Sequence, residues 1–201
     1  MKEKYKNICG VILAGGKATR YKGQNKALLK IDQETFYNRT STLLSTIFED
    51  VIVITNKASD FPEDNFLKYA DLIKEIGPLG GIHSALTNAP VCEAVFVVAV
   101  DMPFISEAII REICDAYQNN KKDILIPIIK QDKEPLAAVY SKNILGKLNT
   151  YLKETSDYSI RSFLKIVNTE YYTLISNTVN IKSFSNINTE NDYRNLLKNK
   201  L

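Results

Sequence analysis

The 201-residue chain has few of the residues on which covalent catalysis and redox chemistry depend. It contains three cysteines, one histidine and no tryptophan. The cysteines (Cys9, Cys92 and Cys114) are scattered and form no Cys-x-x-Cys pair, so the sequence indicates neither a zinc site nor a disulfide framework. The lone histidine, His83, would have to serve in any Ser-His or Cys-His pair. The composition therefore disfavours a nucleophilic catalyst and favours a structural role for His83.

The chain also lacks a long hydrophobic run and a large charge excess. No run approaches the length of a membrane span, and the apolar stretch near the N-terminus has no Ala-x-Ala cleavage site. We therefore expect a cytoplasmic protein with no membrane partner. The net charge of +3 is too small for a general nucleic-acid surface, although a local anionic site remains open. The length and the 45% hydrophobic content predict a single α/β domain over residues 1–201.

Glycine is sparse, and its placement is informative. Seven of the eight glycines occupy positions 10, 15, 16, 23, 77, 80 and 81. Residues 8–14 predict a buried strand that ends at Gly15-Gly16. The stretch that follows has no acid and carries four cations, Lys17, Arg20, Lys22 and Lys26. Backbone N–H groups and cations after a strand indicate a phosphate-binding loop, with a solvated surface loop as the alternative.

Two common phosphate loops are excluded by their spacing. A Walker A loop needs Gly-x-x-x-x-Gly-Lys-Ser/Thr, whereas Val11 lies five residues before Gly16 and Ala18 follows the lysine. A dinucleotide fingerprint needs Gly-x-Gly-x-x-Gly, which Gly15-Gly16 and Gly23 do not satisfy. We therefore expect the cations to contribute more to phosphate binding than a tight glycine turn does.

Hydrophobic periodicity predicts alternating strands and helices along the chain. Strands are expected at residues 8–14, 51–54, 66–70, 94–100, 123–129, 135–140 and 171–175. Helices are expected at 35–47, 82–89, 106–117, 142–153, 159–167 and 190–198, with a helical turn at 61–65 and a glycine loop at 77–81. The first strand, helix and strand form a right-handed βαβ unit. The pattern predicts an α/β fold with a Rossmann-like, mostly parallel sheet flanked by helices.

Asp101 follows the most hydrophobic predicted strand, residues 94–100. Ligands bind at the edge of a parallel sheet where the strands end. We therefore expect Asp101 to share a crevice with Gly15-Gly16, Asn56 and the 77–81 loop. A carboxylate opposite a cationic phosphate loop suggests a Mg²⁺ ligand. A helix N-cap is the alternative role, for which Ser106 is better placed.

Together these landmarks resemble the molybdenum cofactor guanylyltransferase family. The family pattern of Leu-Ala-Gly-Gly, an arginine, a glycine and a lysine before Leu-Leu corresponds to Leu13-Ala14-Gly15-Gly16, Arg20, Gly23 and Lys26-Ala27-Leu28-Leu29. Its later landmarks correspond to Asp71, residues 77–81, Asp101-Met102-Pro103 and Asn186-Ile187-Asn188-Thr189. The resemblance covers nearly the whole chain and implies a nucleotide-diphospho-sugar transferase-like fold.

The resemblance also implies a reaction, in which the GMP part of GTP is joined to molybdopterin and pyrophosphate is released. Backbone groups of Leu13, Ala14, Gly15 and Gly16 would bind the nucleotide, with Asn56 and Asp71 at guanine or ribose. Arg20 and Lys26 would neutralise the triphosphate during catalysis, and Asp101 would hold Mg²⁺. Pro135, Arg161, Asn186 and Asn188 would lie in the C-terminal half, which receives the pterin. GTP and the molybdopterin cofactor are the implied partners, and other enzymes of cofactor biosynthesis or cofactor acceptors are further candidates.

Two positions depart from the family pattern, which often has Met where this chain has Tyr21 and Asp where it has Asn25. The loss of that aspartate raises the positive charge of the loop. The related cytidylyltransferases usually carry Gln between the Asp and the Pro, so Met102 favours guanine. The alternatives are a cytidylyltransferase or sugar-phosphate nucleotidyltransferase, and a non-catalytic nucleotide-binding protein. The retention of Asp101 with Lys26 argues against the non-catalytic alternative.

Overall fold

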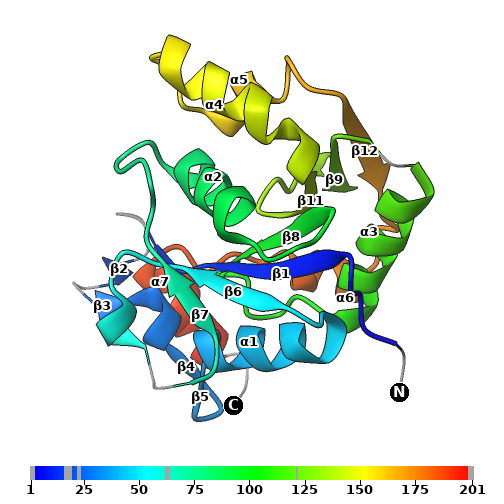
Figure 1. The fold of residues 1–201 in the computed structure, drawn as a ribbon. Helices are drawn as coiled ribbons and strands as arrows, with labels where there is room; N and C mark the ends of the chain where they lie inside the picture. The colour runs from blue at the N-terminus through cyan, green and yellow to red at the C-terminus, as the bar shows by residue number, and fades with distance from the viewer. Residues whose placement is uncertain (1–2, 16–19, 22–23, 62–63, 121, 199–201) are drawn as a thin grey trace.

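The computed structural model describes residues 3–15, 20–21, 24–61, 64–120 and 122–198 (Figure 1). Its main sheet has the strand order β10-β9-β11-β8-β1-β6-β7, and β12 also pairs with β9. The strands of this sheet are β1 (Ile8–Leu13), β6 (Val51–Ile54), β7 (Leu67–Tyr69), β8 (Ala94–Ala99), β9 (Ile124–Ile129), β10 (Asp132–Lys133), β11 (Ala137–Ser141) and β12 (Thr169–Thr173).

Short strand pairs and helices complete the described structure. The pairs are β2 (Arg20–Tyr21) with β3 (Gln24–Asn25), and β4 (Lys30–Ile31) with β5 (Glu34–Thr35). The helices are α1 (Phe36–Ile47), α2 (Pro78–Asn88), α3 (Glu107–Asn120), α4 (Leu145–Glu154), α5 (Ile160–Phe163), α6 (Thr178–Ser183) and α7 (Glu190–Lys198). Single 3₁₀ turns are η2 (Lys26–Leu28), η3 (Ala58–Asp60) and η4 (Lys142–Ile144). None of the helices in these ranges is long and apolar enough to cross a membrane.

The sheet is mostly parallel, as the sequence predicts. Strand β1 pairs in parallel with both β6 and β8, and β6 pairs in parallel with β7. Strand β11 lies between β8 and β9 and is antiparallel to both. The predicted central strand, β8, is buried along its whole length, and the βαβ unit formed by β1, α1 and β6 is confirmed.

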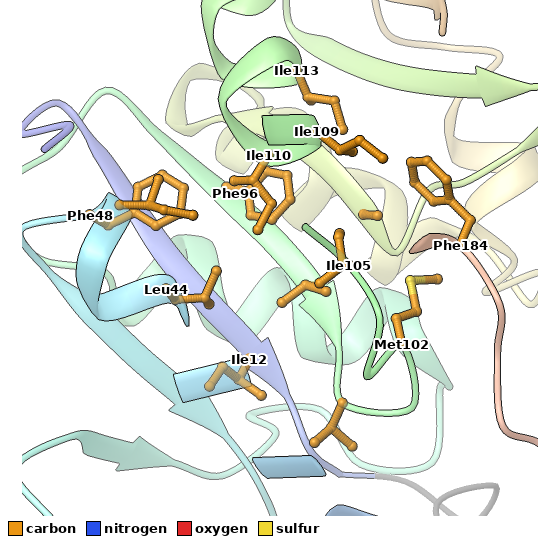
Figure 2. Packing of buried hydrophobic residues seen from close by; sticks show 14 of the residues in the cluster. Ile12, Leu44, Phe48, Phe96, Met102, Ile105, Ile109, Ile110, Ile113 and Phe184 are labelled. Atoms are coloured by element: carbon orange, nitrogen blue, oxygen red, sulfur yellow. The ribbon is translucent and has the colours of Figure 1, made fainter. Parts of the chain in front are cut away.

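The two faces of the sheet carry separate helix layers (Figure 1). Alternate residues of the central strands sort to the two faces, because successive side chains of a strand point in opposite directions. Val11 and Val97 join the cluster that contains Leu79 and Ile82 of α2. Ile12 and Phe96 join the cluster that contains residues of α1 and α3, which Figure 2 shows from close by. Both faces of the central strands β1 and β8 are therefore buried.

Gly10 allows a large aromatic side chain to pack directly on β1. A Cβ atom added at Gly10 would lie 2.7 Å from Cδ2 of Phe48. The Phe48 ring in turn stacks on Phe96, with centroids 5.7 Å apart (Figure 2). The absence of a side chain at position 10 is thus a packing requirement.

The strands β1, β6 and β8 end at the same edge of the sheet, where the chain segments that follow them meet. The peptide N–H of Val100 donates to the Leu13 carbonyl at 3.1 Å, and that of Ala14 donates to the Ile54 carbonyl at 2.9 Å. We call this the carboxyl edge. The segment that precedes β11 reaches it too, because the Ala99 N–H donates to the Leu136 carbonyl at 2.9 Å.

Three local predictions are wrong. The segment 77–81 is no loop, because α2 begins at Pro78 and includes Gly80 and Gly81. The helical turn expected at 61–65 is not present at residues 61, 64 and 65, and residues 62 and 63 lie outside the described structure; a 3₁₀ turn precedes this range, at Ala58–Asp60. The predicted helix 159–167 has only four helical residues, those of α5.

The glycines at the start of α2 approach other parts of the chain closely. A Cβ at Gly80 would lie 2.9 Å from both the Ile73 carbonyl oxygen and Cγ1 of Ile76. A Cβ at Gly81 would lie 3.1 Å from Cδ2 of Leu13. The close backbone approach expected of these glycines is therefore made to protein atoms, and Gly77 supplies the left-handed turn (φ 69°) before the helix.

Candidate active site

Lys26 is a buried cation at the carboxyl edge. It begins η2, where Asn25 caps the turn by accepting a hydrogen bond from the Ala27 N–H at 3.1 Å. The Lys26 residue is only 2% exposed, and its Nζ donates to Oδ1 of Asn188 at 3.3 Å. A lysine is rarely buried to this degree without a polar partner. The cap also gives Asn25 a structural function at the position where the family often has aspartate.

Asp101 follows β8 and is close enough to Lys26 to interact with it electrostatically. Burial raises the pKa of the Asp101 carboxyl, and the positive charge of Lys26 opposes that increase. The Asp101 carbonyl accepts a hydrogen bond from the Ile187 N–H at 3.0 Å. Helix α3 is capped by Ser106, whose Oγ accepts from the Ile109 N–H at 3.4 Å. Asp101 is therefore not needed as the N-cap.

Asn56 and Asp71 form a second group at this edge. The Asn56 Nδ2 donates to Oδ2 of Asp71 at 2.7 Å, and the Asp71 N–H donates to Oδ1 of Asn56 at 3.0 Å. A Cβ at Gly15 would lie 3.7 Å from Asn56 Nδ2, and one at Gly81 would lie 3.7 Å from Asp71 Oδ1. The structure thus brings Gly15, Asn56, Asp71 and the first turn of α2 together, as the sequence predicts.

The predicted phosphate-binding loop lies partly within the described residues. Gly16, Lys17, Lys22 and Gly23 lie outside the described residues. The backbone of Arg20 pairs with Asn25 in a short hairpin, so its predicted phosphate contact stays a prediction. The Leu13 carbonyl and the Ala14 N–H are already hydrogen-bonded within the sheet edge. The binding of a nucleotide by the backbone of Leu13, Ala14 and Gly15 stays a prediction.

The residues predicted for the pterin half fall into two places. Asn188 contacts Lys26, Asn186 belongs to the same segment, and Pro135 lies next to Leu136 at the carboxyl edge. Arg161 instead belongs to α5, whose Phe163 packs in the cluster on the α2 face of the sheet. Their contact with a pterin remains a prediction.

The sequence analysis missed two carboxylates near this edge. Burial and, to a smaller extent, the charge of Asp132 raise the pKa of Glu134 to about 7. Asp192 accepts backbone hydrogen bonds from Asn188 at 3.0 Å and Thr189 at 2.7 Å. An acid directly before a predicted buried strand, and an acid three residues after the helix cap Thr189, were the signals available in the sequence.

The donor set at the carboxyl edge fits a Mg²⁺ ion shared with a substrate. In the described chain no group of three or more His, Cys, Asp or Glu side chains could hold a metal ion by itself. Asp101 and Asp192 are both close enough to Lys26 to interact with it electrostatically, and of the two Asp101 is the one that follows a strand of the parallel sheet. Mg²⁺ is commonly held by one or two carboxylates together with substrate phosphates and water, so a lone carboxylate is sufficient.

Two cavities outlined by described residues lie away from this edge. One, of about 590 Å³, runs along α4 from Gly146 to Thr155. The other, of about 680 Å³, lies near Cys92 and Lys142, where β8 begins. Neither is lined by Lys26, Asp71 or Asp101, and the candidate site is marked by its grouping of charged and polar side chains.

The fold is that of an α/β protein with a mostly parallel sheet, and its carboxyl edge carries a buried lysine near a carboxylate. Residues 10–172 match the family described as the MobA-like NTP transferase domain. The chain belongs to this family, and the predicted class of enzyme, a nucleotidyltransferase, is confirmed.

Two curated relatives match most of this chain. A protein of Clostridium perfringens (strain 13 / Type A), named "Probable molybdenum cofactor guanylyltransferase", is 34% identical over 195 residues, covering 94% of this chain and 96% of its own. The molybdenum cofactor guanylyltransferase of Desulfosudis oleivorans is 33% identical over 147 residues, covering 73% and 72% of the two chains. The resemblance found in the sequence is thereby confirmed.

Solved structures show the same fold. Molybdopterin-guanine dinucleotide biosynthesis protein A from Archaeoglobus fulgidus superposes with a TM-score of 0.78 at 23% identity, covering 96% of this chain and 100% of that one. A Mycobacterium tuberculosis H37Rv protein solved in complex with manganese superposes with a TM-score of 0.65 at 18% identity, covering 96% and 98%. The predicted nucleotide-diphospho-sugar transferase-like fold is confirmed.

Proposed function

We propose that this protein transfers the GMP part of GTP to molybdopterin, forming molybdopterin guanine dinucleotide and pyrophosphate. The observation that carries the proposal is the buried ammonium of Lys26 next to Asp101 at the carboxyl edge. Relatives of 33–34% identity that are named molybdenum cofactor guanylyltransferases support the choice of GTP and the pterin as substrates.

The reaction exchanges one phosphoanhydride bond for another. An oxygen of the terminal phosphate of molybdopterin forms a bond to the α-phosphorus of GTP. The bond from that phosphorus to the α–β bridging oxygen breaks, and pyrophosphate leaves with the electron pair. Such a transfer depends on positioning and charge neutralisation, which agrees with the scarcity of nucleophiles in the sequence.

Lys26 is suited to the charge that develops during this step. Negative charge accumulates on the leaving pyrophosphate only as the α–β bond breaks, so a cation fixed beside it favours the transition state over bound GTP. Because Lys26 is buried, its interaction with phosphate is screened less by water than that of a surface lysine. Arg20 is proposed to neutralise the triphosphate in the bound state.

Asp101 would hold Mg²⁺ through its carboxylate. When bound, the ion neutralises phosphate oxygens and helps to align them. A structural neighbour from Mycobacterium tuberculosis was solved in complex with manganese, which supports the use of a divalent cation; the preference for magnesium and its place at Asp101 belong to the proposal.

Guanine selection is assigned to Asp71. A carboxylate accepts hydrogen bonds from both N–H donors on one edge of guanine, whereas cytosine does not offer the same pair. Both polar atoms of the Asn56 side chain are directed to Asp71, so Asn56 orients the carboxylate that reads the base. The backbone of Gly15 and Gly16 would bind the nucleotide, and the C-terminal half, with Pro135, Arg161 and Asn186, would receive the pterin. The cytoplasmic location stays a prediction.

Turnover of three nucleotides tests the proposal. The protein is incubated with molybdopterin, Mg²⁺ and α-labelled GTP, CTP or ATP, and the labelled dinucleotide is separated and counted. We expect the product with GTP alone, and none with Asp101→Asn. A preference for CTP would replace the proposal with a cytidylyltransferase. Nucleotide binding without product from any of the three would support the non-catalytic alternative.

A further inference from the structure

We infer that Asn188 is a positioning residue for Lys26, and that residues 186–192 set the relative place of Lys26 and Asp101. We call these residues the C-terminal segment. This inference adds a positioning residue to the proposed function. Only its kinetic consequences rest on that function. Its structural part concerns contacts within the chain, which can be tested without substrate.

Two consecutive residues of the C-terminal segment contact the two proposed catalytic residues. The Ile187 N–H donates to the Asp101 carbonyl at 3.0 Å, and Oδ1 of Asn188 accepts from Nζ of Lys26 at 3.3 Å. Ile187 is 6% exposed and belongs to the same core cluster as Met102. The segment is therefore anchored in the core at the point where it reaches the site.

The conformation of the C-terminal segment is fixed by hydrogen bonds of its own. Oδ2 of Asp192 accepts from the N–H groups of Asn188 and Thr189, at 3.0 and 2.7 Å. The Asp192 N–H in return donates to Oγ1 of Thr189 at 3.1 Å. These reciprocal contacts cap α7, and they hold the backbone from which the Asn188 side chain extends.

The last part of the chain makes a second connection to the residues around Lys26, this time through Tyr193 of α7. The Tyr193 hydroxyl donates to the Lys30 carbonyl at 2.8 Å and accepts from the Lys30 N–H at 3.3 Å. The Tyr193 ring also packs edge-on against Phe36, with centroids 6.2 Å apart. Residues 26–30 are thus held at one end by Asn188, which precedes α7, and at the other by Tyr193 of α7.

The chemistry of the contact favours a positioning role. Lysine has a flexible four-carbon stem, so an unsupported ammonium would occupy several places. Two carboxylates, Asp101 and Asp192, already interact electrostatically with Lys26. A neutral amide oxygen fixes the ammonium without adding a third negative charge beside it, so more of its positive charge remains available for phosphate. An aspartate at position 188 would hold the ammonium equally well but would neutralise it.

The structural test observes Lys26 directly. The side-chain ammonium signal of Lys26 is assigned by nuclear magnetic resonance from its loss in Lys26→Ala, and is then compared in Asn188→Ala, Asn188→Asp and Asn191→Ala. Asn191 is the matched control, because it is an exposed asparagine of α7. We expect the signal to shift and its hydrogens to exchange faster in Asn188→Ala, and to stay unchanged in Asn191→Ala. An unchanged Lys26 signal in Asn188→Ala would overturn the inference.

The kinetic test uses a double-mutant cycle in single-turnover experiments. Asn188→Ala should lower the rate by roughly 10- to 100-fold, the scale of a hydrogen bond to a charged group, with little change in nucleotide affinity. In the Lys26→Ala background, the same substitution should have no further effect. Asn188→Asp should keep Lys26 ordered in the spectra and still be slow, which a merely structural role does not predict.

Other outcomes are decisive as well. If the rate losses multiply, and the KM for molybdopterin rises in the Lys26→Ala background, Asn188 binds the pterin directly and the inference is wrong. If Asn188→Ala does not fold, Asn188→Ser replaces it in both tests. If the wild-type protein turns over no nucleotide, the proposed function fails, while the Lys26 signal still decides the positioning role.

Discussion

Asn56 and Asp71 are joined by two hydrogen bonds that run in opposite directions. The Asn56 Nδ2 donates to the Asp71 carboxylate at 2.7 Å, and the Asp71 N–H donates to the Asn56 Oδ1 at 3.0 Å. The first residue follows β6 and the second follows β7. The pair therefore ties two loops of the carboxyl edge together and fixes the direction of the carboxylate.

Substitution of Asn56 should change nucleotide selectivity through Asp71. We expect Asp71→Ala to lower the preference for GTP over other nucleotides by roughly 10- to 100-fold and Asn56→Ala by about tenfold, since each removes hydrogen bonds at or next to a charged group. The double variant should lose no more than Asp71→Ala. Competition assays with GTP and CTP measure the preference, with exposed Asn38→Ala as the control. Unchanged selectivity in Asp71→Ala would mean that guanine is read elsewhere.

Lys26→Ala should slow the chemical step much more than it weakens GTP binding. We expect kcat to fall by roughly 10² to 10³, the scale for the loss of one electrostatic contact in the transition state. Lys26→Arg should recover only part of the rate, because a planar fork does not replace a compact point charge. Calorimetry of GTP binding together with single-turnover rates separates the two effects. If the affinity for GTP falls in proportion to the rate, Lys26 stabilises bound GTP and the transition state equally, and this account of its role is wrong.

Glu134 should make the protein less stable as the pH rises through the weakly acidic range. Burial and Asp132 raise the pKa of Glu134 from 4.5 to about 7 in the folded state. Between these values the folded chain keeps a proton that the unfolded chain has released, so higher pH favours unfolding.

Urea unfolding at pH 5 and pH 7.5 measures this effect. The wild-type protein should lose more unfolding free energy between the two values than Glu134→Gln, whose side chain stays neutral. The control, Glu49→Gln, replaces an exposed carboxylate and should behave as the wild type. An equal loss in Glu134→Gln and the wild type would show that Glu134 ionises normally in the folded state.

Two glycines should respond oppositely to alanine. Gly10→Ala would place Cβ 2.7 Å from the Phe48 ring, and Phe48 is confined by its stacking on Phe96. We expect a loss of about 1–3 kcal/mol, typical of an overpacked core. Gly146→Ala meets no atom within 4 Å and lies in helix α4, so it should gain about 0.5–1 kcal/mol. Denaturant unfolding of both variants provides the comparison, and equal stabilities would contradict the packing argument.

The sequence predicted the sheet well because its signal is local. Continuous apolar runs such as those of β1 and β8 indicate strands buried on both faces. Once parallel strands are inferred, the residues that follow them must meet at one edge, and this placed Asp101, Asn56 and Gly15 correctly.

Local sequence patterns could not predict the start of α2 or the role of Asn188. Gly80 and Gly81 disfavour a helix by propensity, and they are required by contacts with Ile73, Ile76 and Leu13 that only the folded chain reveals. Asn188 lies 162 residues after Lys26, so no local pattern connects them. Helix α6 did have a local signal in its cap, Asn177, which accepts from the Asn180 N–H at 2.8 Å.

The most direct test of the central claim follows both ends of the triphosphate in a single turnover. GTP labelled at the α- or the γ-phosphate is mixed with molybdopterin, Mg²⁺ and excess enzyme. We predict that the α label enters the pterin dinucleotide and the γ label leaves as pyrophosphate, one for one. We also predict that Asp101→Asn forms neither product at any Mg²⁺ concentration. Release of the γ label as orthophosphate, or a near-normal rate for Asp101→Asn, would contradict the account.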